Sequence, residues 1–186
     1  MSITTASGRR DQGSRQRRKY VGKYRGVVLQ NVDPMGIGRI QVQVIGVFTL
    51  ASSWAMPSFP VAGPQTGQVA IPPIGAGVWV EFEQGDPDRP IWTGCYYSTR
   101  AEIPSAVQLV TPPIPAMTMQ TPLQNVIQLS DAPLTPATGG IVLRSASGAS
   151  IVVNDTGIYI SDGKNGTITL IGGVVTVNGG ALVVTP

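Results

Sequence analysis

Glycine and proline interrupt this chain so often that long helices have no room to form. The sequence of 186 residues contains 23 glycines and 16 prolines, and the longest stretches free of both are ten residues long, 47–56 and 123–132. A mean helix in a globular protein has about 11 to 12 residues, and both residue types disfavour a helix interior. The chain is therefore expected to consist of short β-strands joined by turns.

Scarce residue types exclude several kinds of chemistry. The chain has one cysteine, Cys95, and no histidine. An intrachain disulfide is therefore impossible, and Ser-His-Asp triads and histidine metal sites are excluded. Charged residues make up 12% of the chain and hydrophobic residues 42%, which indicates a packed protein rather than a disordered one. We expect no catalytic residue, no cofactor and no bound metal.

Positive charge is concentrated at the beginning of the chain. Eight of the thirteen basic residues lie in the first 25 positions, where Asp11 is the only acid, and the remaining residues carry five basic and nine acidic groups. Residues 1–19 lack the apolar stretch of a secretory signal, and we interpret them as a flexible basic arm. Such an arm is attracted to nucleic acid, to an anionic membrane or to an acidic protein groove. Its candidate binding residues are Arg9, Arg10, Arg15, Arg17, Arg18 and Lys19.

Residues 20–100 alternate short β-branched runs with turn signals. Residues 39–45 read RIQVQVI and residues 77–83 read GVWVEFE, and both alternate apolar with polar positions, as half-buried strands do. About five strands are expected in this part of the chain. They favour a small barrel, because closure removes the exposed strand edges that would otherwise pair with other chains.

The character of the sequence changes between residues 101 and 138. Seven prolines in this segment disfavour both a long helix and a central strand, and we interpret it as an extended connector. The spacing of Leu123, Val126 and Ile127 permits one short helical turn within 123–129.

Residues 139–186 repeat a pattern of short apolar strands and turns. The expected strands are 141–144, 151–153, 158–160, 168–171, 174–177 and 182–184. Each contains two apolar residues spaced two apart; these pairs are 141/143, 151/153, 158/160, 168/170, 175/177 and 182/184. Because alternate residues of a strand point to the same side, the pairs form one continuous apolar face. The pattern is typical of a stacked β repeat.

A single copy of this segment cannot bury enough surface to offset the conformational entropy that its ordering costs. Three copies wound around one axis would set each apolar face against two others and give each strand edge a neighbour. We therefore predict an obligate homotrimer in which residues 139–186 form an intertwined β-helix or β-prism needle. The alternative is a monomeric solenoid, or a meander packed on the barrel.

Several motifs of residues 20–100 occur in an order that resembles one protein family. They run from Asp33-Pro34-Met35-Gly36-Ile37-Gly38-Arg39 to Gly85-Asp86-Pro87-Asp88-Arg89-Pro90. The sequence resembles the OB-fold domain of contractile-tail spike proteins, which include phage baseplate assembly protein V, the valine-glycine repeat spike of type VI secretion, and the spikes of tailocins and contractile injection systems. The signature positions are Asp33, Pro34, Gly36, Gly38, Arg39, Trp54, Gly63, Pro72, Gly75, Gly85, Asp86, Pro87, Arg89, Pro90 and Gly94.

The resemblance implies an all-β fold, with an N-terminal OB-fold barrel followed by a trimeric needle, and a structural function. In this family three chains form the central spike of a baseplate, join a hub at the end of the inner tube and puncture the target membrane on sheath contraction. For this chain it implies a homotrimer, a separate hub protein, transient contact with a target membrane, and a PAAR-type tip protein. We add the hypothesis that the basic arm, residues 1–19, is the segment that binds the hub. The candidate seat of the tip protein is Leu182, Val183 and Val184. The expected location is a phage tail or injection-particle baseplate, assembled in the bacterial cytoplasm without a signal peptide.

Other functions fit the sequence less well. An OB-fold nucleic-acid-binding protein with a basic arm is the alternative, and it would bind DNA with steep salt dependence; the net acidic body disfavours it, and we expect no nucleic-acid partner. A β-helical polysaccharide lyase or hydrolase would need clustered carboxylates or bases along a groove. Residues 139–186 offer only Arg144, Asp155, Asp162 and Lys164, so we predict no enzymatic activity.

Overall fold

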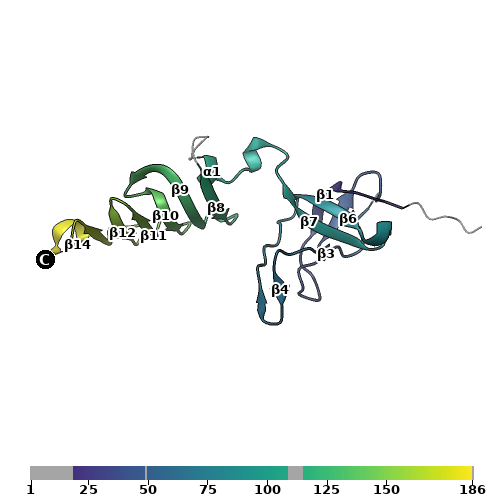
Figure 1. Cartoon of the computed structure of the whole chain (residues 1–186), viewed down its shortest axis with the longest axis horizontal. Helices are drawn as coiled ribbons and strands as arrows, with labels where there is room; N and C mark the ends of the chain where they lie inside the picture. The colour runs from purple at the N-terminus through teal and green to yellow at the C-terminus, as the bar shows by residue number, and fades with distance from the viewer. Residues whose placement is uncertain (1–18, 49, 109–114, 186) are drawn as a thin grey trace, which may run out of the picture. The chain divides into compact units, whose positions relative to one another are not determined.

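The computed structural model describes residues 19–48, 50–108 and 115–185. The chain divides after Ser98 into two compact units, both drawn in Figure 1. Nearly all of the regular structure in the described residues is β-strand. No helix among them is long and apolar enough to cross a membrane.

The first unit is built on a five-stranded sheet with the strand order β2-β1-β6-β7-β3. Its strands are β1 (Tyr24–Gln30), β2 (Gln41–Val44), β3 (Met56–Pro57), β6 (Gly77–Phe82) and β7 (Pro90–Tyr96). Neighbouring strands are antiparallel except for β3 and β7. A short turn, η1 (Glu83–Gly85), joins β6 to β7. A separate hairpin of β4 (Ala62–Gly63) and β5 (Thr66–Gly67) projects from the sheet (Figure 1).

The core of this unit follows the alternation expected from the sequence. Ile40, Val42 and Val44 are fully buried, while the glutamines between them are only partly covered. Strand β6 is likewise buried at Val78, Val80 and Phe82. The whole core cluster is Val28, Ile40, Val42, Val44, Ala55, Val78, Val80, Phe82 and Trp92.

The second unit is one antiparallel meander in which eight strands pair in the order of the chain. The strands are β8 (Ala116–Gln120), β9 (Val126–Thr135), β10 (Thr138–Arg144), β11 (Ser150–Asn154), β12 (Gly157–Ser161), β13 (Thr167–Ile171), β14 (Val174–Val177) and β15 (Leu182–Val184). Two short turns of helix, η2 (Arg100–Glu102) and α1 (Ser105–Gln108), precede them, and η3 (Asn178–Gly180) lies between β14 and β15. All six strands expected after residue 139 are present.

The structure differs from the expectation in the segment before Gly139. The helical turn expected within 123–129 is wrong, because Val126 begins strand β9. The sheet itself begins at Ala116, inside the stretch that its prolines had indicated as an extended connector. Pro122 lies in the turn between β8 and β9, where no ladder hydrogen bond is needed. Pro133 lies beyond Ser130, the last β9 residue paired with β8, near a shift in the β9–β10 register.

Candidate functional site

Two apolar rows cross all eight strands of the second unit. The strand register places one residue of each row on every strand. The first row is Met117, Leu129, Ile141, Val153, Ile158, Leu170, Val175 and Val184. The second row is Met119, Ile127, Leu143, Ile151, Ile160, Ile168, Val177 and Leu182. The apolar pairs expected from the sequence therefore do share one face, and that face extends two strands further than expected.

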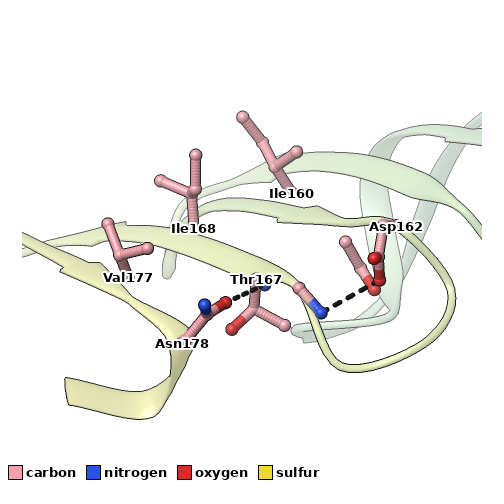
Figure 2. A pocket seen from close by; sticks show the side chains of 8 residues that line it. Ile160, Asp162, Thr167, Ile168, Val177 and Asn178 are labelled. Atoms are coloured by element: carbon pink, nitrogen blue, oxygen red, sulfur yellow. Dashed lines mark hydrogen bonds between the residues drawn. The ribbon is translucent and has the colours of Figure 1, made fainter. Parts of the chain in front are cut away.

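This apolar face is open to solvent in a single copy. Leu143 is 41% exposed and Leu182 is 58% exposed, although both are large and apolar. Figure 2 shows Ile160, Ile168 and Val177 projecting to one side from three neighbouring strands. These three side chains line a hollow of about 360 Å³, and its other walls are Ser161, Asp162, Gly166, Thr167 and Asn178, at or beside the ends of the strands.

The opposite face of the sheet has a different character. Its middle row is Thr118, Gln128, Val142, Val152, Tyr159, Thr169, Thr176 and Val183. The two valines at its centre are only 4% and 1% exposed. The Gln128 amide donates to the Ala106 carbonyl oxygen at 3.0 Å, so helix α1 is tied to this side. A single copy thus covers the two valines at the centre of this face but leaves both apolar rows of the other face open, which is unfavourable in water. The apolar face is therefore a surface for assembly.

The turns at the edges of the sheet are joined to one another by side chains. Asn125 Oδ1 accepts the amide of Ala146 at 3.1 Å, and Asn154 Nδ2 donates to the Thr135 carbonyl oxygen at 2.9 Å. Asn178 Oδ1 accepts the amide of Thr167 at 2.9 Å, as drawn in Figure 2. Each bond links a residue in or beside one turn to a residue in or beside another turn that is not the next one along the chain. These side-chain hydrogen bonds therefore connect the ends of the strands to one another along the length of the sheet.

The signature loop, residues 33–39, is organised around one carboxylate. Asp33 Oδ1 accepts hydrogen bonds from Arg39 Nη2 at 2.7 Å, from Arg39 Nε at 3.0 Å and from the Met35 amide at 3.0 Å. Asp33 Oδ2 accepts the amides of Ile37 and Arg39. The Arg39 guanidinium, helped by these amides, holds the pKa of the Asp33 carboxyl well below its usual range despite desolvation that would raise it. All of these groups are engaged with each other, which makes the loop a structural device.

Aromatic side chains pack this loop onto the sheet. The Arg39 guanidinium lies 5.5 Å from the Trp54 ring centroid. Gly38 has a φ of +85°, and a Cβ there would lie 2.7 Å from the Phe59 ring. Its carbonyl oxygen accepts the Trp92 indole N–H at 3.1 Å, and Trp92 is buried. Only glycine therefore fits both the backbone and the space at this position.

The remaining signature residues also build turns. Asp86 Oδ1 accepts the Asp88 amide at 3.1 Å, and the Arg89 amide donates to the Asp86 carbonyl oxygen at 3.0 Å. Pro90 begins β7 and is fully buried. Those not already named are Pro34 and Gly36 in the signature loop, Gly63 in β4, Pro72 and Gly75 before β6, Gly85 and Pro87 in the β6–β7 connection, and Gly94 at the β6–β7 bulge. The described signature positions thus support the fold.

The other candidate residues are placed as follows. Arg9, Arg10, Arg15, Arg17 and Arg18 lie outside the described residues, whereas Lys19 is described and packs beside Gly85. Leu182 and Val184 are the last members of the two apolar rows, and Val183 lies on the opposite face. Sequence reasoning missed Met117, Met119, Ile127 and Leu129. The same spacing of two residues was present there, but the neighbouring prolines had indicated a connector.

Two family models match this chain. One is described as the type VI secretion system/phage-baseplate injector OB domain and matches residues 24–97. The other is described as the phage baseplate V C-terminal trimerisation domain and matches residues 116–183. The chain belongs to the phage baseplate V family. The predicted order, an OB-fold followed by a β-rich trimerisation domain, is confirmed. Apart from Val184, which follows directly, the apolar rows lie within the trimerisation domain of a homotrimer.

Two of the curated proteins similar to this phage baseplate V family member are named as spike proteins and one as a toxin. The type VI secretion system spike protein VgrG5 of Pseudomonas aeruginosa is 42% identical over 55 residues, which are 30% of this chain and 6% of that protein. VgrG1c of the same organism is 44% identical over 54 residues, 29% of this chain and 7% of that protein. The actin cross-linking toxin VgrG1 of Vibrio cholerae is 53% identical over 47 residues, 25% of this chain and 4% of that protein. This chain thus matches less than a tenth of the length of each.

Proposed function

We propose that three copies of this chain form the central spike of a contractile tail or injection machine, which is assembled in the bacterial cytoplasm and pierces a target envelope when its sheath contracts. The observation that carries this proposal is the pair of apolar rows. They run through every strand of the trimerisation domain and stay open in a single copy. Three such faces turned toward a common axis would form a closed rod with a dry interior.

A rod of this construction suits a mechanical role. Every strand from β9 to β14 is hydrogen-bonded to a neighbour on both sides. The edge turns are tied by Asn125, Asn154 and Asn178. An axial load would therefore be shared among many bonds at once, and no single strand could slide without breaking its register. The function proposed here needs this stiffness and involves no catalytic turnover; reproducible cleavage of peptidoglycan or glycans by the pure protein would contradict it.

The end of the needle is the proposed seat of a separate tip protein of the PAAR-repeat type. Leu182 and Val184 complete the two apolar rows, so three copies would bring them together at the last strand. Val183, on the opposite face, is half exposed. A blunt apolar end of this kind favours a cap that covers it, and the capped tip would touch the target membrane only during piercing.

The other end of the spike is proposed to join a hub protein at the end of the inner tube, with the basic arm as one contact. The arm has a fixed root, because the Tyr20 amide donates to the Gly85 carbonyl oxygen at 3.0 Å and Lys19 packs against Gly85. Deleting residues 1–18 keeps Lys19 and Tyr20 in place and removes five of the six basic residues of the arm. We expect fewer spikes incorporated into particles; unchanged incorporation would remove the arm from the proposal.

The proposed function is tested in the particle itself. Ile151 belongs to the second apolar row and Thr169 to the middle row of the opposite face. Ile151→Lys would place three charges in the rod interior, whereas Thr169→Lys would place them outside. We expect particles carrying Ile151→Lys to lack the spike by electron microscopy and to lose killing or delivery, and particles carrying Thr169→Lys to keep both. Normal particles and normal killing with Ile151→Lys would overturn the proposal.

A further inference from the structure

A long part of the first unit carries no charge at all. Between Arg39 and Glu81 the sequence contains no aspartate, glutamate, lysine or arginine. Much of this stretch is nevertheless on the surface of the single copy: residues 60–71 are all exposed. Protein surfaces that face only water are rich in charged residues, whereas the cores of protein interfaces are depleted in them. An exposed stretch without charge therefore indicates a surface that is covered in the assembly.

The β4–β5 hairpin within this stretch has little support of its own. Its two strands pair only with each other, through Ala62–Gly67 and Gly63–Thr66, and belong to no larger sheet. Both strands are exposed. A two-stranded hairpin is marginal in water unless it packs against something. Its defined shape here calls for a packing partner.

Beside the hairpin lies an apolar hollow. It has a volume of about 280 Å³, and its apolar walls are Ile37 of the signature loop together with Phe59, Val69 and Ile71. Asn31 and Asp33 also line it, but the Asp33 carboxylate is paired with Arg39 and only 4% exposed. Val69 is 66% exposed and lies two residues after the end of β5, so the rim of the hollow and the hairpin are close in the chain. We call the hairpin, Val69, Ile71 and Ile37 the hairpin face.

We propose that the hairpin face is a contact between the OB units of neighbouring copies in the trimer, with the hairpin of one copy covering the hollow of the next. Each copy carries both a projection and a hollow, which is what a heterologous contact around a threefold axis requires. The absence of charge fits identical chains, because every charge on such a surface would be repeated three times around the axis. This inference rests on the trimer and not on the piercing role.

A second copy suits the hairpin face better than an unrelated protein. Two different proteins that meet in solution gain association rate and selectivity from complementary charges. The hairpin face has no charged side chain, and the one carboxylate of the hollow, Asp33, is already paired with Arg39. Copies within a trimer need no such steering, since the trimerisation domain already holds them at millimolar effective concentration. At that effective concentration even a small apolar contact between the OB units of neighbouring copies would form.

Hydrogen exchange on the full-length trimer tests this contact. We expect the amides of residues 62–67 to exchange at least 100-fold more slowly than in an unstructured peptide. In Val69→Lys, with the mass of three chains retained, their exchange should accelerate at least tenfold. The matched control is Ile45→Lys, which changes an 87% exposed aliphatic residue of the same uncharged stretch that does not line the hollow; it should leave the exchange unchanged.

Three outcomes would overturn the proposal. The first is rapid exchange of residues 62–67 in the wild-type trimer, and the second is equal acceleration by Val69→Lys and Ile45→Lys. The third is protection that arises only in the assembled particle, which would assign the hairpin face to another protein. None of these depends on whether Ile151→Lys abolishes killing, so a failure here is distinct from a failure of the proposed function.

Discussion

The Arg39 guanidinium donates two hydrogen bonds to a single oxygen of Asp33, at 2.7 and 3.0 Å, and its own backbone amide donates to the other oxygen at 3.2 Å. One residue thereby holds both oxygens of the carboxylate that folds the signature loop. The Asp33 side chain is 4% exposed and the Arg39 side chain 17%. The Asp33–Arg39 ion pair thus closes the loop, and neither charge is left to bind a ligand. Gly36 and Gly38 supply the left-handed backbone conformation that the loop needs.

Asp33→Asn should change how stability depends on pH. Because the folded pKa of Asp33 lies below its unfolded value of about 3.9, its contribution is fully present above that value and is lost as the pH falls toward the folded pKa. The variant should therefore unfold at a lower temperature at pH 7, and the difference from wild type should shrink below about pH 4. Thermal unfolding followed by circular dichroism from pH 7 to pH 2 measures this. A difference that stays constant across the range would contradict the assigned role.

Trp92→Phe should destabilise the first unit more than Trp79→Phe. Trp92 is buried and donates to the Gly38 carbonyl oxygen, so phenylalanine leaves that acceptor without its partner. The expected loss is about 1 to 3 kcal/mol of unfolding free energy. Trp79 is only partly buried and contacts Tyr96 and Arg25 on the outer side of the sheet. Urea unfolding of both variants makes the comparison, and equal losses would argue against a special role for the Trp92 indole N–H.

The strands of this chain could be predicted because burial on a sheet follows alternation in the sequence. Ile40, Val42 and Val44 are buried as their spacing indicates, and Ile141 and Leu143 share a face as theirs does. Strands that lie close to prolines could not be predicted in this way. Proline marks a position that cannot donate to a ladder, but it does not exclude a strand that starts after it, as β8 does, or one that contains it near an irregularity of the ladder, as β9 does. Both strands were therefore missed.

The contacts of the signature residues could not be predicted from local sequence. Gly38 and Trp92 are 54 positions apart, and only the folded sheet brings the indole N–H to the glycine carbonyl. A motif could indicate that Gly38 lies in a turn, but not that the Phe59 ring occupies the space of its missing side chain. The hairpin face was likewise hidden, because a lack of charge says nothing about exposure until the fold is known.

Gly163→Ala should weaken the needle more than Gly172→Ala does. Both glycines have a left-handed backbone, with φ of +78° and +57°, so alanine meets a similar conformational strain of about 1 to 2 kcal/mol at each. Only at Gly163 would the new Cβ collide with a neighbouring turn, 2.6 Å from the Ala149 nitrogen; nothing lies within 4 Å at Gly172. Overpacking adds about 1 to 3 kcal/mol. Thermal unfolding of the two variants at equal protein concentration measures the difference. Equal losses of stability would show that the neighbouring turns can move to make room for the new methyl group.

Leu143→Lys should dissociate the trimer, whereas Thr176→Lys should not. Leu143 pairs with Ile127 and Ile151 in the second apolar row, and Thr176 lies on the opposite face. Assembly buries the exposed 41% of each Leu143, which is worth roughly 2 to 4 kcal/mol per trimer, and every 1.4 kcal/mol is about a factor of ten in the association constant. The variant would in addition have to desolvate three lysine charges. Light scattering at micromolar concentration should give the mass of three chains for wild type and Thr176→Lys, and a smaller mass for Leu143→Lys. A Leu143→Lys protein that keeps the mass of three chains would mean that the apolar rows do not face one another across the axis.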